Sequence, residues 1–245
     1  MNILQPEPTD SILEEAIRGR RIAPSEALEL LNSADLLKLI AAAREIRNRK
    51  NDASVVTYTM FRIINYTTFC DVNCSFCSYH EPIGSSAGVV LSVEEIVQKM
   101  RAAVALGANQ MFLQGGVNPG IPFDYYVDVV RTVKAVFGPH IHIRAFSPSE
   151  ILGMERLTGL PLRKVVQELK NAGVDSVPGA GAEILSDRMR AILSPRKLSV
   201  SDWVRVMQMC HEEGLPGSAN IVFGSQETAE EIIEYCRQNL TRYKV

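Results

Sequence analysis

Short β-branched or apolar runs alternate with helical segments over most of the chain after residue 55. Runs at residues 61–64, 110–113, 141–146, 174–177 and 219–223 predict strands. Helices are predicted after Ser92, over residues 125–136, 162–171, 182–192 and 202–213, and from about Thr228. This alternation indicates an α/β fold with a parallel sheet and right-handed crossovers. By itself it fits a (β/α)8 barrel and a doubly wound open sheet equally well.

A different pattern precedes the first strand. Residues 1–54 predict an N-terminal helical segment, with leucine-rich stripes over residues 27–31 and 36–46. Ser11 and Glu14 have the spacing of a capping box, which predicts a helix start at Ser11. We therefore divide the chain into this segment and a barrel domain over residues 55–245.

Three of the five cysteines lie close together directly after the first predicted strand. Cys70, Cys74 and Cys77 have the spacing C-x3-C-x2-C. Cysteine thiolates are the usual ligands of iron–sulfur clusters, and three of them leave the fourth iron of a cubane cluster open to a small molecule. A structural zinc site with His80 as the fourth ligand is the alternative, although zinc sites usually draw their ligands from two separated segments.

Glycines and polar residues follow the later predicted strands. Gln114, Gly115 and Gly116 follow the second strand, where glycines let a ligand approach the backbone or mark an ordinary turn. Ser147 and Glu150 follow the third strand; they are candidates for ligand binding, unless Ser147 or its neighbour Ser149 caps the next helix.

The fourth and fifth strands have similar motifs. Glu183 ends a glycine-rich turn after the fourth strand, where it binds a ligand or complements a helix dipole as a first-turn acid. Gly224 follows the fifth strand. His142 lies within a strand, where a single histidine is more often a structural hydrogen-bonding group than a catalyst. Arg188, Arg196 and Lys197 are interpreted as solvated charges, with pairing to a carboxylate as the alternative.

The composition restricts the partners. Net charge is −2 without a basic block, so we expect neither nucleic acid nor an anionic membrane surface as a partner. No apolar run is long enough to span a bilayer, and the N-terminus lacks the features of a secretion signal. The odd cysteine count favours the reducing cytoplasm over a disulfide framework.

The cysteine loop, with Phe76 directly before the last cysteine, resembles that of radical S-adenosylmethionine (SAM) enzymes. The resemblance implies a [4Fe-4S] cluster held by Cys70, Cys74 and Cys77, with SAM on the open iron and cleaved to a 5′-deoxyadenosyl radical. It also implies a TIM-type barrel rather than an open sheet. By the same resemblance, the residues expected at the SAM site are Gln114, Gly115, Gly116, Ser147, Glu183 and Gly224.

Within that superfamily, several motifs resemble dehypoxanthine futalosine cyclases of the futalosine route to menaquinone. They are Asn65-Tyr66-Thr67, Leu113-Gln114-Gly115-Gly116-x-Asn118-Pro119, Phe146-Ser147-Pro148-x-Glu150 and Ser194-Pro195-Arg196-Lys197. The resemblance implies cyclisation of a small-molecule futalosine derivative, with flavodoxin or ferredoxin as electron donor. Aminofutalosine synthase, a deazaflavin-forming enzyme and an inactive metal-binding paralogue are the alternatives.

The length limits the expected barrel. The predicted strands account for about five or six of eight, whereas a full barrel needs ~250 residues for eight units. A partial barrel, truncated at its C-terminal end, leaves an open edge and uncovered apolar faces. We therefore expect self-association or a completing polypeptide, with weak turnover by the chain alone.

Overall fold

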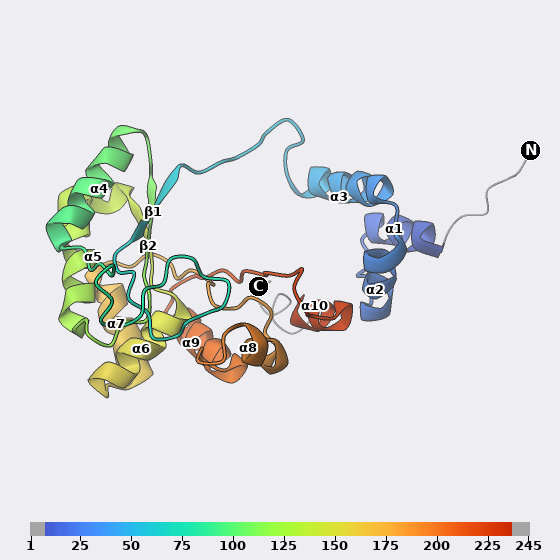
Figure 1. Ribbon diagram of the computed structural model, residues 1–245. Coiled ribbons are helices and arrows are strands. Elements are labelled where there is room, and N and C mark those ends of the chain that lie inside the picture. The colour runs from blue at the N-terminus through green and yellow to red at the C-terminus, as the bar shows by residue number, and fades with distance from the viewer. Residues whose placement is uncertain (1–7, 237–245) are drawn as a thin grey trace, which may run out of the picture. The chain divides into compact units, whose positions relative to one another are not determined.

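The computed structural model describes residues 8–236, which form two compact units (Figure 1). The helical unit combines the chain up to Tyr58 with the part that begins at Ser225, and the sheet unit runs from Thr59 to Gly224. The sequence places residues 55–245 in one barrel domain, whereas here the last described helix groups with the N-terminal helices. The division between residues 54 and 55 stays a prediction.

The helical unit contains α1 (Pro8–Ile17), α2 (Pro24–Ser33), α3 (Leu36–Lys50) and α10 (Ala229–Tyr235). Its core is formed by Ile12, Leu13, Leu30 and Ala42. The predicted capping box at Ser11 is wrong, because α1 begins at Pro8 and Ser11 lies inside the helix. The predicted start near Thr228 is confirmed, since Thr228 and Glu231 form a capping box at the start of α10, which packs against α2.

The sheet unit is built on three parallel strands in the order β1-β2-β3. They are β1 (Phe61–Asn65), β2 (Gln110–Gln114) and β3 (His142–Ala145). Single parallel bridges, from Arg144 to Ser176 and from Val177 to Gly217, continue this order to a fourth and a fifth segment. The sheet unit is thus an open, partial α/β barrel.

The predicted strands at residues 174–177 and 219–223 do not form as regular strands, because the first makes only the isolated bridges of Ser176 and Val177 and the second makes none. Pro178 and Pro216 flank the two bridged segments, and proline has no N–H to donate to a ladder. In the last segment, the Val222 N–H donates to the Glu183 carbonyl oxygen instead of pairing in the sheet.

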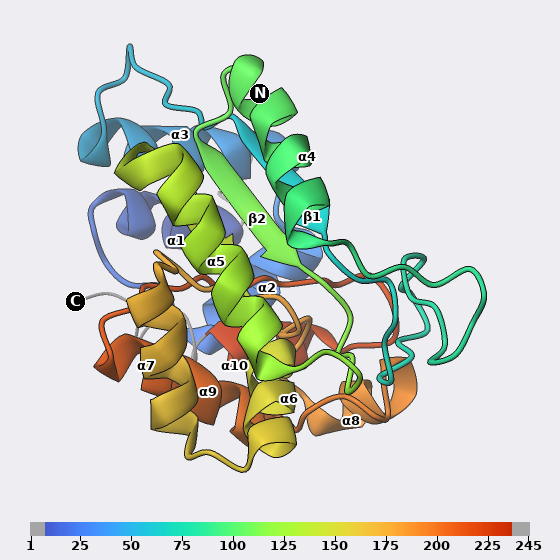
Figure 2. The ribbon, with the colours of Figure 1, turned by 90° about the vertical axis from the view of Figure 1, so that its left-hand side faces the viewer.

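Helices cover one face of the sheet. The helices of the sheet unit are α4 (Val93–Ala105), α5 (Phe123–Phe137), α6 (Pro148–Thr158), α7 (Leu162–Ala172), α8 (Asp187–Leu193) and α9 (Val200–Glu212), with a short 3-10 turn η1 (Gly138–His140). Figure 2 shows α4 and α5 lying over β1 and β2. Met111, Leu113 and Ile143 are fully buried, so every second strand residue packs beneath these helices. The opposite face carries Phe112 and Arg144.

The helix start at Ser92 was predicted correctly, whereas the start predicted at residue 182 was not. Ser92 and Glu95 form the predicted capping box of α4. The helix predicted over residues 182–192 begins only at Asp187, because Gly181 and Glu183 have φ angles of 84° and 43°, which are incompatible with a right-handed helix. Helix α6 was not predicted as an element.

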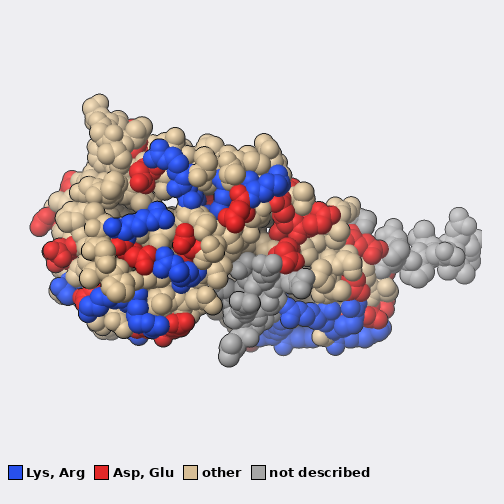
Figure 3. All heavy atoms as spheres, turned by 90° about the horizontal axis from the view of Figure 1, so that it is seen from below, with Lys and Arg blue, Asp and Glu red and all other residues tan. Residues whose placement is uncertain are grey.

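The surface of the sheet unit mixes charges of both signs, as the left-hand part of the face in Figure 3 shows. Ion pairs from Arg205 to Glu155 and from Arg163 to Glu212 join α9 to α6 and α7. Exposed pairs of this kind contribute little to stability. Among residues 8–236, no helix has the length and apolar character that crossing a bilayer would require.

A buried carboxyl group links the ends of all three strands. Glu150, only 4% exposed, accepts hydrogen bonds from the Tyr66 hydroxyl after β1, from Gly115 N (3.0 Å) after β2 and from Ser147 N (2.7 Å) after β3. Burial raises the pKa of Tyr66 well above its ordinary value, so its hydroxyl keeps the proton that it donates. Burial also raises the pKa of Glu150 to about 7, against the opposing effect of its donors.

Replacing Glu150 should change how stability depends on pH. The folded pKa of about 7 lies above the ordinary 4.5, so the folded protein holds this proton more tightly than the unfolded chain. The free energy of unfolding should therefore fall from about pH 4.5 to about pH 7, by up to about 3 kcal/mol, and then level off. In Glu150→Gln this fall should disappear in urea unfolding from pH 5 to 8. Glu155→Gln, on the same helix, should retain it; equal slopes in all three proteins would contradict the assignment.

Candidate cofactor site at the carboxyl ends of the strands

Three cysteines line one cavity of about 240 Å³ beyond the ends of the strands. Cys70, Cys74 and Cys77 are partly exposed and none forms a disulfide. Asn73, with a φ of 54°, reverses the loop before Cys74, and Cys77 N donates to the Cys74 carbonyl oxygen at 3.1 Å. The loop thus presents three free thiols to the same space.

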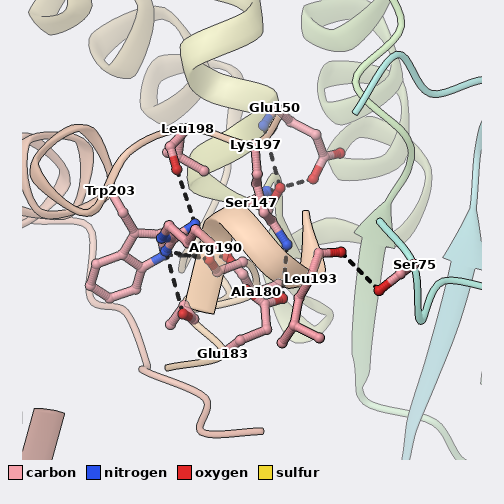
Figure 4. Close-up of polar contacts among 12 residues, drawn as sticks. Ser75, Ser147, Glu150, Ala180, Glu183, Arg190, Leu193, Lys197, Leu198 and Trp203 are labelled. Carbon is pink, nitrogen blue, oxygen red and sulfur yellow. Dashed lines mark hydrogen bonds and ion pairs between the residues drawn. The ribbon is translucent and has the colours of Figure 1, made fainter. Parts of the chain in front are cut away.

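Hydrogen bonds on two sides hold the cysteine loop. Cys70 N donates to the Glu81 carbonyl oxygen and Asp71 N to that of Val117, both at 3.0 Å. On the other side, both the N–H and the hydroxyl of Ser75 donate to the Leu193 carbonyl oxygen at the end of α8, each at 2.9 Å (Figure 4). The loop is therefore fixed to the turn after β2 and to the last turn of α8.

The two glycines after β2 leave room for the cysteine loop. A Cβ atom on Gly116 would lie 2.2 Å from the Phe69 carbonyl oxygen and 2.5 Å from Cys70 Cβ. A Cβ atom on Gly115 would lie 2.6 Å from Cζ of Tyr66. Packing therefore requires glycine at both positions, independently of any ligand. The role of these glycines at the SAM site stays a prediction.

An ion pair between Lys197 and Glu183 also lines the cavity. Lys197 Nζ is 2.8 Å from Glu183 Oε1, and the two side chains are 9% and 12% exposed (Figure 4). The Lys197 ammonium also lies 5.6 Å from the centre of the Phe76 ring, within the cysteine loop. The interpretation of Lys197 as a solvated charge is wrong. Burial raises the pKa of the Cys74 thiol, and the Lys197 charge acts in the opposite direction.

Arg190 in α8 holds the backbone that carries Glu183. Its buried guanidinium donates to the carbonyl oxygens of Gly181 (2.8 Å), Ala182 (3.3 Å) and Leu198 (3.0 Å). Trp203 Nε1 donates to the carbonyl oxygen of Ala180 at 3.3 Å (Figure 4). These donors satisfy the carbonyl groups of an irregular turn that makes few backbone pairs of its own. The sequence analysis missed Arg190 and Trp203, because their partners are carbonyl groups of residues without distinctive side chains.

The structure brings most predicted site residues together. The cavity is lined by Cys70, Cys74, Cys77, Gln114, Gly115, Gly116, Ser147 and Glu183, by the candidate Glu150, and also by Asn65, Phe76 and Lys197, which the predicted set did not include. Gly224 is not among the lining residues. The capping alternative for Ser147 is confirmed, since it forms a capping box with Glu150 at the start of α6. The structural interpretation of His142 is supported by its Nε2, which lies 2.7 Å from Ser176 Oγ.

The donor set suits an iron–sulfur cluster better than a single metal ion. Within residues 8–236, no three His, Cys, Asp or Glu side chains converge closely enough to hold one metal ion. His80 Nδ1 lies 3.1 Å from the Cys77 carbonyl oxygen, within its own loop. This geometry disfavours the zinc alternative. Three thiols that line one cavity fit the three-cysteine ligation of a cubane cluster.

Comparison with known proteins agrees with the family that the cysteine loop resembles. Residues 64–238 match the sequence profile of the radical SAM superfamily. The cyclic dehypoxanthine futalosine synthase of Halalkalibacterium halodurans is 36% identical over 222 residues, which cover 91% of this chain and 60% of that protein. The 5-amino-6-(D-ribitylamino)uracil–L-tyrosine 4-hydroxyphenyl transferase 1 of Methanosarcina acetivorans is 37% identical over 226 residues, covering 92% and 58%. The chain thus spans about 60% of the length of these curated relatives.

Solved structures support the fold. Methylornithine synthase (PylB) aligns with a TM-score of 0.74 at 18% identity, covering 95% of this chain and 65% of that one. The [FeFe]-hydrogenase maturase HydG aligns with a TM-score of 0.72 at 18% identity, covering 96% and 52%. The expected partial barrel is confirmed. Superfamily members use a [4Fe-4S] cluster and SAM, the cofactors expected from the cysteine loop, and the chain belongs to this superfamily of radical SAM enzymes.

Proposed function

We propose that this chain carries the cofactor site of an enzyme that cyclises dehypoxanthine futalosine to cyclic dehypoxanthinyl futalosine, a step of the futalosine route to menaquinone. The observation that carries the proposal is the single cavity shared by three free cysteines and the Gln114-Gly115-Gly116 turn. The 36% identity to a cyclic dehypoxanthine futalosine synthase supports this substrate. A reducing cytoplasm suits the free thiols, and flavodoxin or ferredoxin is the proposed electron donor.

In this proposal Cys70, Cys74 and Cys77 hold the cluster. When bound, the cluster and SAM supply a 5′-deoxyadenosyl radical. Gly115 and Gly116 keep the cavity free of side chains where the backbone borders it, and so expose polar backbone groups to a ligand. Glu183 has one oxygen paired with Lys197, which leaves Oε2 to accept hydrogen bonds from ribose hydroxyls. The ion pair thereby orients the carboxylate, and its second oxygen stays available as a hydrogen-bond acceptor.

A second candidate is the 4-hydroxyphenyl transfer carried out by the Methanosarcina acetivorans relative. That relative is 37% identical over a similar share of this chain, so identity alone does not rank the two reactions. Asn65-Tyr66-Thr67 favours the cyclase, because this motif resembles the entry to the cysteine loop of the cyclase family more than that of its relatives.

Product analysis distinguishes these candidates. The chain, reconstituted with iron and sulfide under anaerobic conditions, is given SAM and a reductant with either dehypoxanthine futalosine or 5-amino-6-(D-ribitylamino)uracil plus L-tyrosine. We expect 5′-deoxyadenosine together with the cyclic product from the first substrate only. A product from the second pair alone would favour the transferase. Cleavage of SAM without either product would contradict both assignments.

Replacing Cys74 by alanine should abolish stable cluster incorporation, because removal of one thiolate leaves an iron without its ligand. Iron and sulfide analysis after reconstitution measures this. Cys236→Ala, in the helical unit, is the matched control and should retain the iron content of the wild type. Full iron content in Cys74→Ala would show that another residue holds the cluster.

Gly116→Ala should also lose most of its iron, although it removes no ligand. The added Cβ would lie 2.2 Å from the Phe69 carbonyl oxygen, so the backbone just before Cys70 must move. Gly120→Ala is the control, since its Cβ would meet only Asn118 Oδ1 at 3.2 Å. Iron contents are compared after identical reconstitution. Normal iron with weakened SAM binding in Gly116→Ala would mean that the glycine serves the cofactor rather than the loop.

A further inference from the structure

Arg144 lies on the sheet face that the helices leave uncovered. Its neighbours in β3, Ile143 and Ala145, are fully buried beneath the helices, so the Arg144 side chain projects to the opposite face. There it lies beside Phe112, its register partner in β2, with the guanidinium carbon 5.1 Å from the ring centre. Its Nη2 donates to the hydroxyl of Ser218.

The charge of Arg144 has no counter-ion within the described part of the chain. No carboxylate of residues 8–236 lies within 4.0 Å of its guanidinium, and its buried Nε has no hydrogen-bond partner there. Burial lowers the pKa of this half-buried group. An arginine presents five donors in a planar fork, of which one is used here, and partial burial without an anion is costly. The remaining donors point to an anionic ligand.

An apolar surface adjoins this cation. The rings of Phe61 and Phe112 are 4.9 Å apart on the same face, and Phe61 is 52% exposed. Ile63, two residues after Phe61 in β1 and the register partner of Phe112, is 45% exposed. A cation that holds a carboxylate, beside two aromatic rings that can stack on a flat apolar group, suits an aromatic carboxylate.

The same face leads to the cofactor cavity. Gln114, which lines that cavity with the cysteines, is two residues beyond Phe112 on β2 and projects to the same side. At a rise of about 3.3 Å per residue, the two positions are about 7 Å apart along the strand. Arg144 and Phe112, which are register partners, therefore lie two residues along the sheet from a residue of the cofactor cavity.

We propose that Arg144 binds the carboxylate of a substrate whose aromatic part lies over Phe61 and Phe112. This inference rests on the proposed function and deepens it, because it gives the chemical class of the group that the sheet recognises. It requires a negative charge on the substrate remote from the reacting carbon.

Binding of simple probes tests the inference without turnover. Equilibrium dialysis of the reconstituted chain against radiolabelled benzoate and its neutral analogue benzamide gives the two dissociation constants. We expect the wild type to prefer benzoate by about tenfold or more, the effect of one charge-assisted hydrogen-bonded pair. Arg144→Met should lose this preference, whereas Arg144→Lys, which keeps the charge, should retain part of it.

Two controls separate recognition from structure. Ser218→Ala removes the hydroxyl partner but keeps the cation, so it should still prefer benzoate. Arg205→Gln removes an ion-paired arginine from α9 and should behave as the wild type. Equal binding of benzoate and benzamide by the wild type, no benzoate binding, or an unchanged preference in Arg144→Met would each overturn the inference. SAM cleavage, measured separately without substrate, reports on the proposed function alone.

Discussion

The hydrogen bonds to the buried Glu150 carboxyl group are the contacts on which the site depends. One side chain accepts donors that follow β1, β2 and β3, and so sets the relative positions of three chain segments at their carboxyl ends. A buried acceptor left without its donors is costly, so these segments cannot separate independently. One of these three segments is the turn at Gly115 and Gly116 after β2, which contacts the cysteine loop. The geometry of the thiols therefore depends on a carboxyl group that is not itself a predicted ligand of the cluster.

On the side of the cavity that carries Glu183, side chains rather than regular secondary structure hold the backbone. Here the backbone is irregular, and Arg190 and Trp203 supply the hydrogen bonds that a sheet or helix would otherwise provide. This turn presents Glu183, and Lys197 fixes the carboxylate by an ion pair with little exposure to water. Ser75 then connects the cysteine loop to the end of α8. Both sides thus meet at the loop, which explains how a short loop holds its shape in an open barrel.

The sequence predicted the parts of this arrangement that are local. The cysteine spacing, the glycine pair and the capping box at Ser92 are contained within a few residues, so each can be recognised without knowing the fold. The ion pair of Lys197 with Glu183 joins residues fourteen positions apart across an irregular turn, and Tyr66 meets Glu150 across eighty-four. The strands expected at residues 174–177 and 219–223 had suitable composition. Whether they pair depends on neighbouring prolines, which lack an N–H donor, and on partner segments that are distant in sequence. Positive φ angles at Gly181 and Glu183 likewise prevent a helix from starting at residue 182, although composition alone supports it.

The close contact between Gly116 and Cys70 has a consequence for how such a chain changes over evolution. The two motifs are forty-six positions apart, yet a side chain at Gly116 would occupy the space of the Cys70 side chain and of the Phe69 carbonyl. A substitution at Gly116 is therefore not tolerated while the cysteine loop keeps its position, and we expect the two motifs to change together. A descendant that lost its cysteines and let this loop move away would at the same time be released from the requirement for glycine at position 116.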